Sequence, residues 1–245
     1  MAEFRMKIAG AVASVVSLFE STPQFFRSYL TEETADFAIV VTTEDLVFEQ
    51  AELDEEARVD GFRRRQFTDP FLERTAIQRA FAEHLLEKNT LLLHGSAVAV
   101  DGEGFLFMAR SGTGKSTHTR FWREVFGVRA VMVNDDKPFL RITSDGVTMF
   151  GSPWSGKHGL DTNIAVPLKG ICLLERGAEN VIVPLDAQAL LPMLRHQSYQ
   201  PLTEARRLVG EGLIERLAAQ VPLWHMTCTK DSQAAQIAYD TMKSI

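Results

Sequence analysis

A stretch rich in glycine and hydroxyl side chains, MARSGTGKSTHTRFW from Met108 to Trp122, constrains the fold more strongly than any other part of the chain. It follows the pattern G-x-x-x-x-G-K-[ST] of phosphate-binding loops, except that Ala109 stands at the first glycine position. Such a loop requires a strand before it and a helix after it, because its backbone N–H groups turn inward around an anion at the positive end of the helix. Both flanks fit, since FLFMA predicts a strand and KSTHTRFWREVFG predicts a helix that ends at Gly127.

The loop predicts a binding site for the phosphates of a nucleotide, with ATP and Mg²⁺ as the expected cofactors. Lys115 supplies a compact positive charge for the β- and γ-phosphates, and the hydroxyl of Ser116 can ligate the metal. The alternative is a glycine-rich turn that contains a lysine by chance. The predicted nucleotide-binding residues are Arg110, Ser111, Gly112, Thr113, Gly114, Lys115, Ser116 and Thr117.

Two adjacent carboxylates, Asp135 and Asp136, follow an apolar strand in the segment VMVNDD. One carboxylate at a strand end is typical of a magnesium site, so the second could act as a general base toward an attacking hydroxyl. Neighbouring residues of a strand point to opposite faces, so both carboxylates reach one site only if the strand has ended or twisted there. An Asp-Asp turn without function is the alternative.

Two further groups give weaker signals. His94 lies in LLLHGSAVAV, which we interpret as one strand, and a histidine in an apolar strand is more often a core residue than a ligand. Lys157 and His158 lie in the glycine-flanked segment SPWSGKHG, which could contact a phosphate or a substrate. A surface turn is the equally simple interpretation of that segment.

The remaining pattern predicts an α/β fold in two parts. Residues 1–88 are expected to form a small N-terminal α+β region packed on the core, and residues 89–245 the nucleotide-binding core. IAGAVASVVSLF, residues 8–19, predicts a buried strand, because it lacks a small-residue cleavage site and is too short to cross a bilayer. TDPFLERTAIQRAFAEHLLEKN predicts a helix, and the acidic TEDLVFEQAELDEEAR a solvated helix or loop.

The composition limits the kinds of partner. A net charge of −6 does not favour non-specific binding to nucleic acid or to an anionic membrane. Cys172 and Cys228 both lie in apolar runs, which predicts small buried side chains in a reducing cytoplasm rather than a disulfide. The oligomeric state, including a homo-oligomer, stays open at this point.

The segment LHGSAVAVDGEGFLFMARSGTGKST followed by NDD resembles the phosphoenolpyruvate carboxykinase and HPr kinase/phosphorylase superfamily, and most closely a set of short HPr-kinase-like bacterial proteins. The strong resemblance covers Leu91 to Lys137, and a looser one continues toward the C-terminus. It implies a mixed sheet like that of the HPr kinase C-terminal domain, in which a hairpin leads into the P-loop.

The resemblance also implies roles for individual residues. Asp135 corresponds to the general base, and Asp136 corresponds to the metal ligand that acts with Ser116. His94 corresponds to a histidine near the metal or the phosphate, and Lys115 contacts the phosphates. The expected catalytic residues are therefore Asp135, His94 and Lys115.

The implied reaction is transfer of the γ-phosphate of Mg-ATP to a hydroxyl, of the serine type, on a peptide, a protein or a small molecule. The segment after Gly151 departs from the HPr kinase signature, so neither HPr as the acceptor nor the reverse phosphorylase activity is supported. The chain is also much shorter than a carboxykinase and lacks a clear match to the arginine and lysine of its oxaloacetate site. A carboxykinase-like lyase and a non-catalytic nucleotide-binding regulator are the alternatives.

Overall fold

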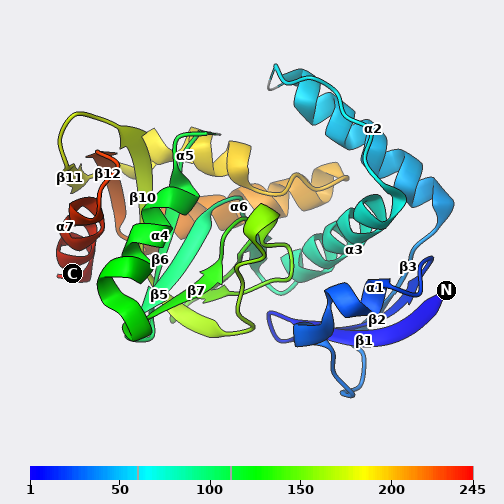
Figure 1. Ribbon diagram of the computed structural model, residues 1–245. Coiled ribbons are helices and arrows are strands. Elements are labelled where there is room, and N and C mark those ends of the chain that lie inside the picture. The colour runs from blue at the N-terminus through cyan, green and yellow to red at the C-terminus, as the bar shows by residue number, and fades with distance from the viewer. Residues whose placement is uncertain (60, 111, 245) are drawn as a thin grey trace. The chain divides into compact units, whose positions relative to one another are not determined.

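The computed structural model describes residues 1–59, 61–110 and 112–244. It contains two compact units, Met1–His84 and Leu85–Ile245, and the division falls near the C-terminal end of one helix. Both units combine helices with a sheet, and the larger sheet is mixed, so the predicted mixed α/β class is confirmed (Figure 1). Within the described residues, no helix carries an apolar stretch of the length that crossing a membrane requires.

The first unit contains a three-stranded sheet of β1 (Ala2–Ile8), β2 (Ala11–Ser17) and β3 (Phe37–Val40), in that order. The strand predicted over residues 8–19 begins too early, because a tight turn precedes the strand that starts at Ala11. Ala9 and Gly10 have φ values of 47° and 71°, and they join β1 to β2 as an antiparallel hairpin. An Ala-Gly pair is a weak turn signal beside Asn-Gly or Asp-Gly, so the sequence pattern did not indicate the reversal.

The helices of this unit are α1 (Thr22–Phe25), η1 (Arg27–Tyr29), α2 (Thr43–Val59) and α3 (Asp69–Leu86). The last two confirm the helix predicted around TAIQRAF and the helical reading of the acidic segment. Two buried carboxylates organise them. Glu49 of α2 pairs with Arg79 of α3, and Glu73 accepts hydrogen bonds from Leu18 N–H and the Thr22 hydroxyl.

The second unit is built on a nine-stranded mixed sheet in the order β4-β8-β9-β10-β6-β5-β7, with β12 beside β10 and β11 beside β12. The long strand β10 pairs with β9 through its first residues and with β6 and β12 further along. The strands are β4 (Thr90–Leu92), β5 (Ser96–Val100), β6 (Glu103–Met108), β7 (Ala130–Asn134), β8 (Phe139–Thr143), β9 (Gly146–Phe150), β10 (Ala165–Arg176), β11 (Val181–Pro184) and β12 (Leu223–Cys228).

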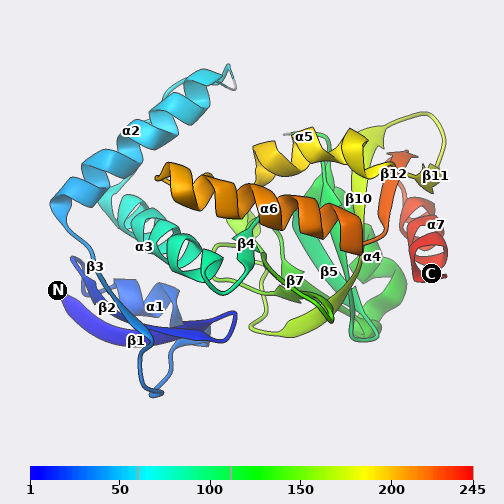
Figure 2. The same cartoon turned by 180° about the vertical axis from the view of Figure 1, so that it is seen from behind.

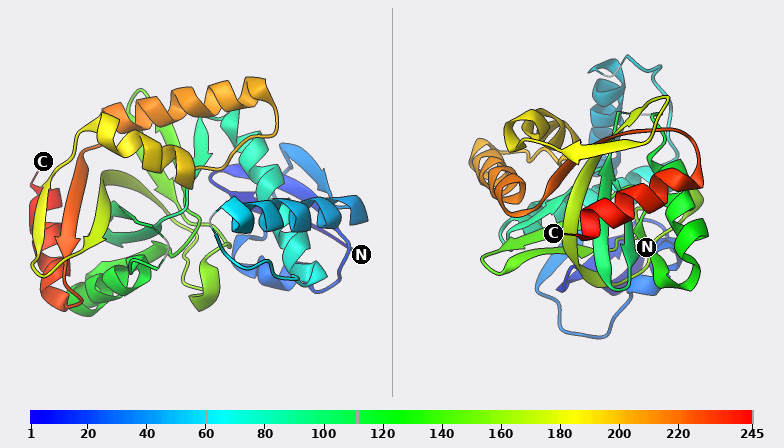
Figure 3. Two further views of the ribbon diagram at one scale, coloured as in Figure 1. Left: turned by 90° about the horizontal axis from the view of Figure 1, so that it is seen from above. Right: turned by 90° about the vertical axis from the view of Figure 1, so that its left-hand side faces the viewer.

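Helices cover both faces of this sheet, and each face has its own apolar core. On one face α5 (Ala187–Gln197) and α6 (Glu204–Gln220) pack through residues such as Leu194 and Leu217 (Figure 2). On the other face α4 (Lys115–Phe126) and α7 (Ser232–Lys243) pack through residues such as Trp122 and Tyr239 (Figure 3). Two short helical turns complete the unit: η2 (Gly127–Arg129) joins α4 to β7, and η3 (Gly156–His158) lies between β9 and β10.

The segment LLLHGSAVAV is two strands rather than the single strand that we expected. Strand β4 pairs with β8, whereas β5 pairs with β6 and β7, so the chain changes partners between Leu92 and Ser96. Gly95 makes this change sterically feasible, because a Cβ there would lie 2.7 Å from the Leu106 side chain. His94 therefore lies in a connecting segment and not inside an apolar strand.

Other local predictions agree with the structure. The predicted hairpins are present as β5–β6 and β8–β9, and the turn of the first is formed by Asp101 and Gly102 at positive φ. The helix after the glycine loop ends at Gly127 as expected. Cys172 is buried and Cys228 is partly exposed, and both are free thiols, so the expectation of full burial fails for Cys228 only.

Candidate functional site

One edge of the large sheet collects the ends of several strands. Because β5 is antiparallel to both β6 and β7, and β10 is parallel to β6, the ends of β6, β7 and β10 lie at the same edge as the start of β5. This edge therefore brings together Ser96, the glycine loop, the two aspartates and Arg176. Most of the residues predicted from the sequence stand here.

The glycine loop occupies the predicted position between a strand and a helix, after β6 and before α4. Gly112 and Gly114 have φ values of 76° and 123°, which L side chains rarely adopt, so glycine is needed for the loop conformation. Gly114 is the N-cap of α4 and provides no side-chain cap, which leaves the positive end of the helix directed at the loop. Ser111, one of the predicted binding residues, lies outside the described residues.

The other predicted loop residues differ in exposure. Arg110 and Ser116 are exposed, and Thr113 and Thr117 are partly buried. Exposed side chains at the first turn of α4 are free to meet a ligand from solvent. Across the described chain, three or more His, Cys, Asp or Glu side chains nowhere gather as a candidate metal cluster. The predicted magnesium ligands are one hydroxyl, of Ser116, and one carboxylate, of Asp136. Such a pair is too small to count as a cluster of this kind.

Arg176 holds the glycine loop from the end of β10. Its guanidinium donates from Nε to the carbonyl oxygen of Thr113 at 3.0 Å and from Nη2 to the carbonyl oxygen of Gly112. These contacts turn the two carbonyls toward the arginine. The sequence analysis missed Arg176, because a single arginine at a strand end carries no sign of its partner 63 residues earlier.

Lys115 begins α4 and lies beside the loop that precedes it. Its ammonium donates to the carbonyl oxygen of Ala109 at 3.2 Å. Burial lowers the pKa of Lys115, while the carboxylate of Asp136 opposes that shift and the charge of Lys137 adds to it. The ammonium therefore lies within electrostatic reach of the aspartates.

A buried asparagine shapes the turn that carries both aspartates. Strand β7 ends at Asn134, whose side-chain oxygen accepts hydrogen bonds from the N–H groups of Asp136 at 2.7 Å and Lys137 at 2.6 Å. Its side-chain amide donates to the carbonyl oxygen of Ser152 at 2.7 Å. The strand has thus ended before the carboxylates, which is the condition for both to serve one site. The sequence analysis passed over Asn134, although the motif NDD contains it.

Asp135 is the more buried of the two carboxylates, with 7% of its surface exposed. The Ser96 hydroxyl at the start of β5 donates to it at 2.7 Å. Ser96 also lies 2.8 Å from the hydroxyl of Thr119 on α4, so this network joins β5, α4 and the end of β7. Neither Ser96 nor Thr119 was singled out from the sequence.

Asp136 is more exposed and lies beside His94. His94 Nε2 is 3.2 Å from Asp136 Oδ1, and Gly95 N–H donates to the Asp136 carbonyl at 2.9 Å. Burial lowers the pKa of His94 to about 3, and the charges of Lys137, Lys115 and His196 act in the same direction. The imidazole is therefore neutral at neutral pH, so its approach to Asp136 is not an ion pair.

The segment SPWSGKHG approaches the aspartate turn. Gly156 packs so closely that a Cβ there would lie 3.3 Å from the Asp136 Cβ. Lys157 and His158 follow in the exposed turn η3, and Gly159 ends it in the left-handed conformation. The structure thus places this loop next to the site, while a contact of Lys157 or His158 with substrate stays a prediction.

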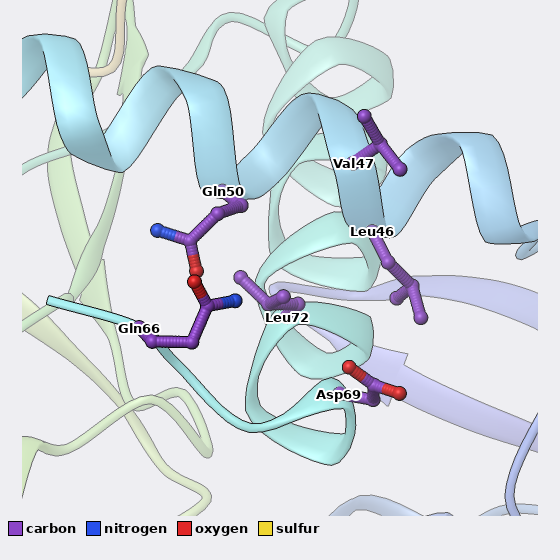
Figure 4. A pocket seen from close by; sticks show the side chains of 6 residues that line it. All are labelled: Leu46, Val47, Gln50, Gln66, Asp69 and Leu72. Carbon is purple, nitrogen blue, oxygen red and sulfur yellow. The ribbon is translucent and has the colours of Figure 1, made fainter.

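A cavity of about 210 Å³ lies in the first unit (Figure 4). It lies between α2, α3 and the segment that joins them, and Gln50 donates to the carbonyl oxygen of Arg65 at its rim. Its lining residues are Leu46, Val47, Gln50, Gln66, Asp69 and Leu72. The sequence analysis attributed no chemistry to these positions.

The second unit is therefore a mixed α/β body with a glycine-lysine loop and two adjacent aspartates at one sheet edge. A family model described as SynChlorMet cassette protein ScmC matches residues 72–229, more than half of the chain, and the chain belongs to this family. A solved structure of the Hpr(Ser) kinase/phosphatase from Coxiella burnetii is similar, with a TM-score of 0.36 and 9% identity over 62% of this chain and 99% of that chain. No curated protein sequence matches this chain.

Proposed function

We propose that the chain is a Mg-ATP-dependent kinase that transfers the γ-phosphate to a hydroxyl of a peptide, a protein or a small molecule. The observation that carries this proposal is the meeting of Lys115, Asp135, Asp136 and His94 at one sheet edge, around a glycine loop that leads into a helix. Phosphoryl transfer needs mainly positioning and charge stabilisation, and this edge offers both. The P-loop core of the HPr kinase type is part of the same proposal.

The described residues fit a nucleotide triphosphate. The two glycines at positive φ and the helix end without a side-chain cap suit backbone contacts to phosphate oxygens. Residues 110–117 would hold the phosphates, with Lys115 on the β- and γ-phosphates. Ser116 and Asp136 would hold Mg²⁺, which when bound neutralises charge on the phosphate oxygens.

In the transfer step, the oxygen of the acceptor hydroxyl attacks the γ-phosphorus, and Asp135 takes the proton of that hydroxyl. The bond from that phosphorus to the bridging oxygen breaks, and ADP leaves with the electron pair. Lys115 and the loop N–H groups stabilise the charge that develops on the transferring group. Because Asp136 is more exposed than Asp135 and contacts His94, an exchange of roles between the two aspartates is the alternative within this proposal.

Two other functions stay as alternatives. A carboxykinase-like lyase would need cationic side chains to bind oxaloacetate, and the basic candidates near the loop are Arg110, Lys137 and Lys157. Three basic side chains are few for binding a dicarboxylate in addition to the phosphates of a nucleotide. A nucleotide-binding regulator without turnover would need a metal ligand but no second carboxylate.

Calorimetry with Mg-ATP tests the nucleotide site directly. We expect Lys115→Ala to weaken binding strongly or to abolish turnover, because the side chain faces the loop and not the core. Lys169→Ala is a suitable control, since Lys169 pairs with Glu103 near the start of β6, far along the strand from the loop. Equal affinity and equal rate in Lys115→Ala and the unmodified protein would contradict the assignment of the loop.

The reaction is tested by measuring ADP release with candidate acceptors. Because the family is described as a cassette protein, the products of neighbouring genes are the first acceptors to try, followed by seryl peptides and free serine. We expect a phosphorylated product that depends on Lys115, and no phosphoenolpyruvate from oxaloacetate and ATP. Phosphoenolpyruvate detected by mass spectrometry, and lost in Lys115→Ala, would favour the lyase.

A further inference from the structure

A basic and exposed segment joins α2 to α3 in the first unit. Residues 62–65, with the sequence Phe-Arg-Arg-Arg, are all exposed, and 57% of the Phe62 surface is accessible. Within the described chain, no carboxylate lies within ion-pair distance of these three guanidinium groups. Glu55 of α2 is within reach of the Arg64 charge, yet it is already paired with Arg58 at 2.5 Å. Three adjacent cations are therefore left for a partner outside the described residues.

The backbone of this segment is fixed against α2. The side-chain amide of Gln50 donates to the carbonyl oxygen of Arg65 at 2.9 Å, and its oxygen accepts from the Phe67 N–H at 3.0 Å. The Phe67 ring also stacks on Phe71 of α3, with ring centroids 4.8 Å apart. The exposed arginines thus extend from a backbone that is already ordered, which lowers the entropy lost when they meet a partner.

The cavity of the first unit adjoins the same segment. Figure 4 shows Gln50 of α2 facing Gln66 of the segment, and both residues line the cavity. The buried side chains of Leu46 and Leu72 and the exposed side chain of Val47 make the rest of the lining largely apolar. Its volume of about 210 Å³ suits one apolar side chain, since apolar cavities of about 150 Å³ bind molecules the size of benzene.

We propose that the cavity and the arginines of residues 63–65 together dock an acidic peptide that carries an apolar side chain. The apolar side chain enters the cavity, and neighbouring carboxylates of the peptide pair with the guanidinium groups. Asp69, exposed at the start of α3, is the only charged residue of the lining and is available to accept N–H groups of the peptide. The inference concerns the first unit alone and goes beyond the proposed kinase function.

Nucleic acid, the other polyanion that arginines bind, fits this surface less well. The chain has a net charge of −6, and α2 carries Glu52, Asp54, Glu55 and Glu56 in its last turns. A long run of phosphates is repelled by such carboxylates, whereas a short peptide needs to place only a few of its own at the arginines. The apolar lining also suits a side chain rather than a phosphate.

Fluorescence anisotropy of a labelled peptide, glutamates around a single leucine, tests the surface on the full chain without nucleotide. We expect the combined variant Arg63→Ala, Arg64→Ala and Arg65→Ala to bind about tenfold more weakly, because each exposed ion pair contributes modestly. Val47→Asp, which places a carboxylate at the cavity, should cost about as much. Arg27→Ala, an exposed arginine on η1 of the same unit, should match the unmodified protein. Unchanged thermal unfolding checks that each variant is folded.

Each other outcome would overturn the inference. Absence of peptide binding by the unmodified protein would remove it, and equal weakening in Arg27→Ala would reduce it to a general charge effect. Affinity that survives Val47→Asp would show that the cavity takes no part. Equal binding of an oligothymidylate of the same charge would replace the peptide with nucleic acid. Because no nucleotide is present, failure of the kinase proposal would leave these results unaffected.

Discussion

The two units of the molecule bury carboxylates in different surroundings. In the first unit, Glu73 is fully buried and accepts hydrogen bonds from the N–H groups of Leu18 and Phe19 and from the Thr22 hydroxyl. Glu49 is nearly as buried, and burial raises its pKa although the paired guanidinium of Arg79 opposes the shift. Both carboxylates are bonded within the unit, and both join one segment of it to another.

In the second unit, Asp135 and Asp136 stand at a strand end beside a glycine loop. Asp135 accepts from the Ser96 hydroxyl, and Asp136 Oδ1 lies 3.2 Å from His94 Nε2. A carboxylate bonded only to groups of its own unit's framework is structural, whereas one that stands beside a glycine loop and a lysine is suited to a ligand. Burial and neutral donors do not separate the two cases, because Glu73 also accepts from N–H groups and a hydroxyl. The glycine loop and the lysine beside the aspartates do.

Exchanging the carboxylates of the second unit for amides should give the largest effects. If Asp135 is the base, Asp135→Asn should bind Mg-ATP almost normally and lose about 10²–10⁴-fold in turnover, the range of general base catalysis. Asp136→Asn should instead lose the part of the nucleotide affinity that depends on Mg²⁺. Calorimetry with and without Mg²⁺, together with ADP release, measures both effects.

The same pair of variants also tests the exchanged assignment. If Asp136→Asn keeps its Mg-ATP affinity and loses turnover while Asp135→Asn loses affinity, the two roles are reversed. An equal fall of affinity in both variants would mean that neither aspartate is the base, and His94 would be the next candidate.

Removing the buried carboxylate of the first unit should change stability and leave nucleotide binding alone. Glu73→Ala leaves three donors without their acceptor, so we expect a loss of about 1–3 kcal/mol in the free energy of unfolding. Urea unfolding measures the loss, and Glu56→Ala, an exposed glutamate of the same unit, serves as the control. A stable Glu73→Ala variant with weakened Mg-ATP binding would break the distinction drawn between the two units.

The smallest effect is expected at Arg176. Arg176→Ala removes both donors from the Gly112 and Thr113 carbonyls, so Mg-ATP affinity should fall about five- to tenfold through a less ordered loop. Arg176→Lys should recover part of this, because it keeps one donor. Arg216→Ala is a matched control, since Arg216 donates to the carbonyl of Ile142 on β8. Equal affinity in Arg176→Ala and Arg216→Ala would show that the loop needs no such support.

Features that depend on neighbouring residues could be predicted from the sequence. The strand, glycine loop and helix around Lys115 lie within one short segment, and so do the hairpin around Asp101 and the strand that ends before Asp135. Backbone preference and hydrophobic period suffice for each of them. The mixed α/β class follows from the same local patterns.

Only the tertiary structure decided which residues share the site. Ser96 and Asp135 are 39 residues apart, and Arg176 reaches the loop from the end of another strand. The break before Ser96 depends on the close approach of Gly95 to Leu106 on a neighbouring strand, which no local pattern reveals. These contacts depend on strand order and register in the sheet, and those are set by how the whole apolar core packs rather than by the propensity of any one segment.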